Sequence, residues 1–338
     1  MPRLSFVLML SFVFLGNKAY PFTTEIDVLH YDVKIEPDIQ SRSIKGTVKI
    51  KLKATQATKT IALDAGDLQI DEVAGANLDA FRVLNHRLLI DVKEATDAIQ
   101  AFSISYHGRP KRGLHFNLNL GQVHTVYFTD HWMICNQVPS DKATINLEIL
   151  VPKGKQAVAS GELVGQKLVA EKILYSWQQT YETPAYTYGF AMGEFNTFET
   201  QIGDIDLRYH SATLDEATLA KIFQETGSIL RFFEEKSGIP YPQKSYSQVL
   251  IGSNFQEMSG LAVFSKTYAA AVLKDSSEIH LTGHELAHQW WGNRITCKDF
   301  SHFWLNEAIA VYMATAYHEK RFGVQKYLAD IALYKKNI

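Results

Sequence analysis

Two hydrophobic periodicities divide this sequence, and they constrain its fold more than any other feature. From residue 20 to about residue 205, apolar and polar residues alternate in short runs rich in Val, Ile and Tyr, separated by Gly- and Pro-containing turns. The segments 26–35 and 144-TINLEILVP-152 are two such runs. Many short strands joined by turns predict an antiparallel all-β saddle or sandwich domain over residues 20–205.

The spacing of apolar residues changes to that of a helix near Gly203. Between residues 214 and 236 they recur every three or four positions, and Gly238 follows as a helix stop. Two further helices are expected at 276–291 and 302–322, with short strands before them. The sequence therefore predicts an α+β domain over residues 206–338.

Composition excludes several classes of function. Lys plus Arg number 34 and Asp plus Glu number 36, so a formal net charge of −2 argues against nucleic acid or an anionic membrane as partner. With 46% hydrophobic and 21% charged residues, the chain resembles a globular protein and not a disordered one. Two cysteines are too few for a disulfide scaffold or a cysteine-built zinc ribbon.

The first 19 residues have the pattern of a secretory signal peptide. Arg3 supplies a positive charge, and the apolar segment 4–15 is too short to span a bilayer comfortably. Gly16 interrupts this segment, and Ala19 offers a small residue for cleavage. We therefore expect a secreted or periplasmic protein, without a membrane span in the mature chain.

The strongest chemical signal is the segment 284-HELAHQWWGNRIT-296. On a helix, His284 and His288 lie on one face, one turn apart, and can share a metal ion. Glu285 lies beside them, where its carboxylate can reach a water molecule on that ion. A catalytic zinc site needs one more protein ligand and leaves one position open for water.

Two patterns for the third ligand can be tested. A third-histidine pattern needs glycine and histidine at positions that hold Trp291 and Arg294, so it is excluded. A carboxylate on a following helix is available as Glu307, in the segment WLNEAIA. His284, His288 and Glu307 then form a thermolysin-like set, and we expect one zinc ion per chain.

These two segments resemble the aminopeptidase N family of zinc metallopeptidases, the gluzincins. Residues 133–152 are similar to part of that family's β domain, and 254-NFQEMSGL-261 stands where the family has the motif Gly-x-Met-Glu-Asn-Trp-Gly-Leu. The resemblance implies a saddle-shaped β domain followed by a thermolysin-like catalytic domain. It also implies that Glu257 binds the free α-ammonium of the substrate, a charge-assisted contact, and that Gly260 belongs to the substrate-binding segment.

The sequence departs from the family in two places. The family's Gln-x-Glu loop, which also touches the substrate N-terminus, is not recognisable in 123-VHTVYFTDH-131. The family's oxyanion-stabilising tyrosine and helical C-terminal domain would lie beyond Ile338, so we expect the catalytic domain to be C-terminally incomplete. An incomplete domain should expose apolar side chains after residue 300. The expected exposed group is Phe303, Ile309, Tyr312 and Met313.

The resemblance and the motif together predict a zinc-dependent aminopeptidase that hydrolyses the N-terminal bond of peptides with a free N-terminus. Glu285 would be the general base, and the strand near Gly260 to Val263 would pair with the extended peptide. Two alternatives stay open: a non-catalytic peptide- or metal-binding scaffold, and a thermolysin-type endopeptidase. An endopeptidase gains nothing from an amine-binding Glu257. The sequence does not predict the oligomeric state.

Overall fold

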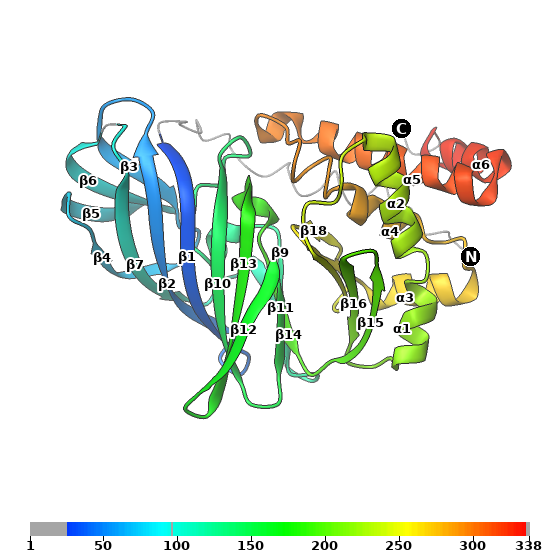
Figure 1. Cartoon of the computed structure of the whole chain (residues 1–338). Helices are drawn as coiled ribbons and strands as arrows, with labels where there is room; N and C mark the ends of the chain where they lie inside the picture. The colour runs from blue at the N-terminus through cyan, green and yellow to red at the C-terminus, as the bar shows by residue number, and fades with distance from the viewer. Residues whose placement is uncertain (1–25, 96, 336–338) are drawn as a thin grey trace.

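The computed structural model describes residues 26–95 and 97–335. The predicted signal peptide, residues 1–19, lies outside the described residues. Strands form the N-terminal part, and a mixed sheet with helices forms the second part beside it (Figure 1). None of the helices in the described ranges is long and apolar enough to cross a membrane.

Three sheets build the N-terminal part. The largest has seven strands in the order β12-β13-β10-β1-β2-β7-β4, and the others have the orders β11-β14-β9-β8 and β3-β6-β5. The strands are β1 (Ile26–Asp38), β2 (Ser43–Ala54), β3 (Thr58–Asp64), β4 (Gln69–Ala74), β5 (Leu78–Leu84), β6 (Arg87–Ala95), β7 (Gln100–Gly108), β8 (Gly113–Asn117), β9 (Gln122–Val126), β10 (Lys142–Pro152), β11 (Gln156–Ala159), β12 (Glu162–Val169), β13 (Lys172–Pro184) and β14 (Phe190–Gly193). The predicted all-β character of this part is confirmed.

The alternation seen in the sequence is the cause of these strands. In β2, Val48 and Ile50 are fully buried, whereas Lys49 and Lys51 face solvent. The pairing is antiparallel as predicted except between β1 and β10, which run parallel. A parallel pair needs a long connection, and here it is supplied by the strands between them.

The second part contains a five-stranded sheet with the order β15-β16-β17-β19-β18. Its strands are β15 (Asn196–Ile202), β16 (Ile205–Ser211), β17 (Ser245–Leu250), β18 (Gln256–Met258) and β19 (Leu261–Phe264). The helices are α1 (Glu216–Ile222), α2 (Thr226–Ser237), α3 (Lys266–Lys274), α4 (His280–Ala287), α5 (Trp304–Phe322) and α6 (Val324–Lys335). The predicted α+β character is confirmed.

Some predicted boundaries differ from the observed ones. The expected division at residue 205 falls inside the β15–β16 hairpin, so β15 belongs to the second sheet and not to the N-terminal part. The helix predicted over 214–236 is two helices: α1 ends at Ile222, and α2 begins at Thr226, whose hydroxyl donates to the Gln248 side chain in β17. Helices α3 and α6 were not predicted.

The five-stranded sheet contributes side chains to two hydrophobic cores, and we refer to it as the shared wall. Its position between the N-terminal sheets and the helices can be followed in Figure 1. In β19, Leu261 and Val263 pack into the core of the N-terminal part, while Ala262 and Phe264 pack into the core formed with the helices. All four side chains are fully buried. Successive residues of one strand therefore hold the two parts together.

Replacing Leu261 with alanine should lower the free energy of unfolding by about 2–5 kcal/mol, because a fully buried side chain is lost from the shared wall. We expect the N-terminal part to lose stability together with the second part. Urea unfolding should be followed by helical circular dichroism and by hydrogen exchange of β1. Leu273→Ala, at a site that is 48% exposed, is the matched control and should change stability by no more than about 0.5 kcal/mol. Unchanged exchange in β1 would contradict the shared wall.

Candidate metal centre

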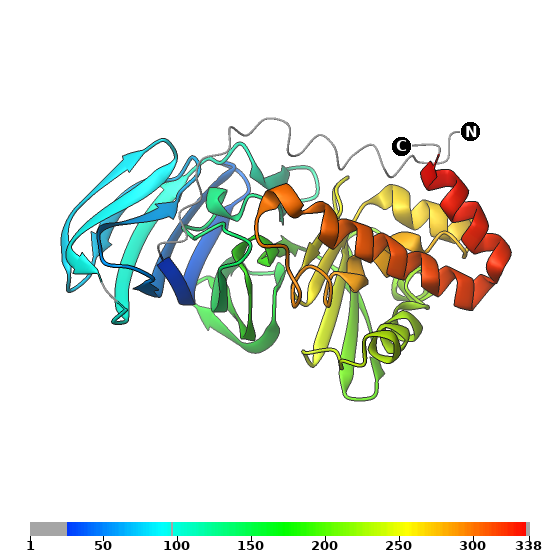
Figure 2. The same ribbon diagram turned by 90° about the horizontal axis from the view of Figure 1, so that it is seen from above.

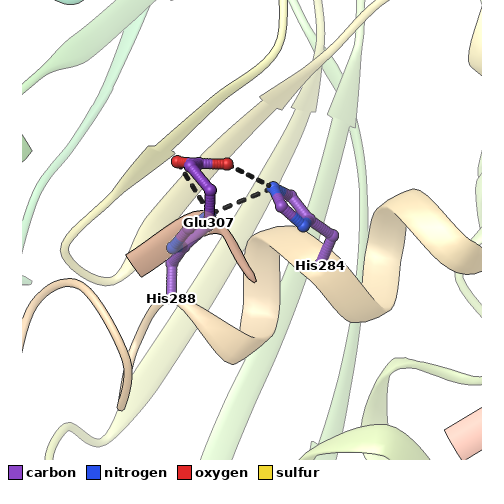
Figure 3. Close-up of side chains that lie close together, drawn as sticks. All are labelled: His284, His288 and Glu307. Carbon is purple, nitrogen blue, oxygen red and sulfur yellow. Dashed lines mark hydrogen bonds and ion pairs between the residues drawn. The ribbon is translucent and has the colours of Figure 1, made fainter. Parts of the chain in front are cut away.

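Two histidines and one glutamate converge where α4 meets α5 (Figure 3). The Nε2 atoms of His284 and His288 are 3.1 Å apart. Oε2 of Glu307 lies 3.3 Å from Nε2 of His284, and Oε1 lies 3.7 Å from Nε2 of His288. The structure thus brings together the three metal ligands that the sequence predicts.

These separations fit a tetrahedral zinc ion. Ligand atoms about 2.0–2.1 Å from zinc lie about 3.3 Å from one another in a tetrahedron, close to the three observed distances. Nδ1 of His288 lies 3.0 Å from the carbonyl oxygen of Trp291. Donation from Nδ1 to this carbonyl leaves the Nε2 lone pair facing the other two ligands, as in metal-binding histidines generally.

The chain at the end of α4 approaches the second histidine closely. Gly292 has φ +148°, and a Cβ built there would lie 3.0 Å from Nδ1 of His288. Any larger residue would press on the ligand ring, so the turn toward α5 requires glycine. Glu307 then enters from the first turn of α5, where the helix dipole favours a carboxylate.

Burial and neighbouring charges set the protonation of this group. Burial lowers the pKa of His288 to about 4. Of the neighbouring groups, Glu307 raises this pKa and His284 lowers it further. A neutral imidazole at physiological pH is the form that binds metal. Burial raises the pKa of Glu307, but the two histidines reverse this effect, so its pKa lies below the ordinary value and the carboxylate is ionised.

Glu285 and Glu257 form a second acidic group beside the ligands. Both side chains are buried: Glu285 is 3% exposed and Glu257 is 2% exposed. One carboxylate oxygen of each residue and a ring nitrogen of His288 lie within 4.8 Å of one another. Burial, followed by repulsion from nearby carboxylates, raises both pKa values well above the ordinary range. Among the described residues, Oε2 of Glu285 and Oε1 of Glu257 have no hydrogen-bond partner. Each keeps an oxygen available to a ligand.

Gln289 joins the metal-binding helix to the strand that carries Glu257. Its side-chain oxygen accepts from the Gly260 amide at 2.9 Å, and its side-chain nitrogen donates to the Met258 carbonyl at 2.9 Å. The residue is fully buried and follows His288 directly. This bidentate contact sets the distance between the ligands and Glu257.

The prediction that the backbone from Gly260 to Val263 is open to a peptide is wrong. β19 lies between β17 and β18, and both backbone groups of Gly260 are already used, by Gln289 and by Ser247. Gly260, at φ +74°, is therefore a turn residue inside the protein and not a substrate-binding residue. The edge strand next to β19 is β18, which carries Glu257.

The predicted exposed group after residue 300 is only partly correct. Tyr312 is 59% exposed, but Phe303 and Met313 are buried, at 5% and 7%. Phe303 packs edge-on against Tyr186 of the N-terminal part, and Met313 belongs to the helical core. Ile309 is partly buried against that core. α5 begins next to the N-terminal part and runs away from it toward α6 (Figure 2).

Sequence reasoning missed two residues of the site, Gln289 and Tyr127. The Tyr127 hydroxyl lies 3.4 Å from Oε2 of Glu257. Tyr127 lies in the segment 123–131, where the sequence has no recognisable Gln-x-Glu loop. Nothing in the local sequence pairs it with a glutamate 130 positions later.

Two family models match the chain: "Peptidase M1 N-terminal domain" over residues 28–187 and "Peptidase family M1 domain" over residues 222–337. Aminopeptidase M1 of Arabidopsis thaliana is 24% identical over 321 residues, and aminopeptidase M1-A of Oryza sativa subsp. japonica is 22% identical over 320. Each match covers 84% of this chain and 36% of the relative. The chain thus spans about a third of the length of these curated relatives.

The fold is similar to that of an M1 zinc metallopeptidase from Deinococcus radiodurans. That crystal structure matches with a TM-score of 0.79 at 22% identity, covering 93% of this chain and 74% of its own. A mutant of the same enzyme bound to a Tyr-Ser-Ala substrate matches with a TM-score of 0.77 at 23% identity, covering 88% and 72%. The arrangement of the two parts is therefore one found in M1 metallopeptidases.

Purified protein should contain one zinc ion per chain, measured by elemental analysis. His288→Ala removes one of the three ligand atoms and should reduce the zinc content well below one. His302→Ala is the control, because His302 is an exposed histidine just before α5; this change should leave the zinc content unchanged. A chelator should lower the unfolding temperature of the wild type and not that of His288→Ala, because bound metal stabilises only a folded site. A His288→Ala variant that keeps as much zinc as the wild type would exclude this site.

Proposed function

Because this chain belongs to the peptidase M1 family, we propose that it is a zinc-dependent aminopeptidase acting outside the cytoplasm on peptides with a free N-terminus. The observation that carries the proposal is the placement of two buried carboxylates, Glu285 and Glu257, against the His284–His288–Glu307 donor set. The N-terminal signal pattern supports the extracytoplasmic location. The donor set, with two imidazoles and one carboxylate, has the chemistry of catalytic zinc sites.

His284, His288 and Glu307 would hold the zinc ion, which polarises a scissile carbonyl and lowers the pKa of a water molecule. The protein's own part in the reaction is carried by Glu285. Its free Oε2 would accept the proton of the attacking water and return it to the departing amine. Burial excludes bulk solvent from this exchange.

Glu257 explains why cleavage would occur at the first peptide bond. A buried carboxylate with one unpartnered oxygen is a favourable partner for a protonated α-amine. Its closeness to Glu285 and His288 sets the distance between that amine and the reacting carbonyl. An internal peptide bond would place an uncharged amide against the same carboxylate, which is costly in a buried position. This favours the exopeptidase over the thermolysin-type endopeptidase.

Glu285→Gln should retain zinc and lower kcat by at least about 10²-fold, since the shape is kept and the proton acceptor is lost. Hydrolysis of aminoacyl-p-nitroanilides and elemental analysis measure the two effects. Glu278→Gln, at an exposed position before α4, is the matched control and should retain full activity. A wild type that binds zinc but hydrolyses no aminoacyl substrate would instead support the non-catalytic scaffold.

Peptides with an acetylated N-terminus should resist cleavage, because acetylation removes the charge that Glu257 binds. Glu257→Gln should lower kcat/KM for free-amine peptides by about 10- to 100-fold, the range expected for a hydrogen bond to a charged group. Peptide digests analysed by mass spectrometry measure both. Equal cleavage of acetylated and free peptides by the wild type would point to the endopeptidase.

A further inference from the structure

A segment of the N-terminal part contacts each residue of the edge strand β18 in turn. The Thr125 hydroxyl lies 3.7 Å from the sulfur of Met258. The Tyr127 backbone amide donates to the side-chain oxygen of Gln256 at 2.7 Å, and the Tyr127 hydroxyl donates to Oε2 of Glu257 at 3.4 Å. The backbone and the side chain of Tyr127 are thus both fixed against β18.

The backbone at this point is strained. Tyr127 and Phe128 have φ of +48° and +46°, values that bulky residues rarely adopt. Two consecutive left-handed aromatic residues are unfavourable, and such strain persists only where the surroundings impose it. The chain leaves β9 by this bend, which directs the Tyr127 ring toward Glu257 instead of along the strand.

Tyr127 is the one side chain among the described residues that donates a hydrogen bond to Glu257. Its hydroxyl occupies Oε2, whereas Oε1 has no partner. Burial, followed by the charges of Glu257 and Glu307, raises the pKa of Tyr127 well above its usual value, so the hydroxyl keeps its proton and remains a donor. A protonated hydroxyl that donates to Oε2 holds the carboxyl group of Glu257 in one orientation.

We propose that Tyr127 is a positioning residue that holds the Glu257 carboxylate with Oε1 facing the substrate α-ammonium, so that the amine pocket is shared by both parts of the chain. The inference rests on the proposed function, in which Glu257 binds that amine. Without the Tyr127 hydroxyl, the Glu257 side chain would be free to turn within the buried acidic group. Part of the attraction for the amine would then be lost, since it depends on distance and direction.

The test compares Tyr127→Phe with the wild type in steady-state hydrolysis of aminoacyl-p-nitroanilides. Removing only the hydroxyl should lower kcat/KM about 10-fold, mainly through a higher KM, with zinc content and unfolding temperature unchanged. Tyr175→Phe is the matched control: its hydroxyl donates to the Lys155 carbonyl in the N-terminal part, so its loss should not affect KM. A Tyr127→Phe variant with wild-type kinetics would overturn the inference.

A double-mutant cycle with Glu257→Gln separates positioning from other roles. If Tyr127 acts through Glu257, adding Tyr127→Phe to Glu257→Gln should change kcat/KM less than twofold further. A full additional loss, or a loss confined to kcat, would show that Tyr127 acts on the reacting carbonyl instead and would overturn the proposal.

The failure of the proposed function gives a different result. In that case the wild type itself lacks aminopeptidase activity, or Glu285→Gln retains it. Wild-type activity that depends on Glu285 but not on Tyr127 would refute the positioning role alone.

Discussion

The crowding of three carboxyl groups, two of them buried and one partly buried, is the constraint on which the rest of this structure depends. Glu257 and Glu285 lie close together beside His288, and among the described residues Glu307 is the one of the three in ion-pair distance of both histidines, His284 and His288. Isolated buried charges are strongly unfavourable unless they are paired. A divalent metal ion and, in the proposed function, an α-ammonium would supply positive charge that favours the ionised forms of Glu257 and Glu285, whose pKa values are otherwise raised. The ligands of the proposed function would therefore compensate the charge of this acidic group.

Holding such a group together requires support from outside the metal-binding helix. Gln289 ties the end of α4 to the turn between β18 and β19, and Tyr127 reaches the same strand from the N-terminal part. β19 supplies the third support, because its alternate side chains are anchored in opposite cores. Each support fixes the position of a carboxylate that would otherwise move away from its neighbours.

Local spacing allowed the metal ligands to be predicted, and long-range pairing did not. His284 and His288 follow from one helical turn, and Glu307 follows because a carboxylate is the remaining ligand type. A short segment carries no information on strand order, so the sequence did not predict that β18, only three residues long, is an edge strand of the five-stranded sheet. Helical spacing shows which side of α5 is apolar but not what covers it, which is why Phe303 was wrongly expected to be exposed.

The shared wall also limits how the two parts of the molecule can move. A hinge between the two parts would have to pull Leu261 and Val263 out of one core while Ala262 and Phe264 stayed in the other. Such a motion would break continuous packing, so domain closure around a ligand is disfavoured. Glu257 and the metal ligands all belong to the second part, where Gln289 ties the end of α4 to β18, so their separation is held by packing inside one rigid body.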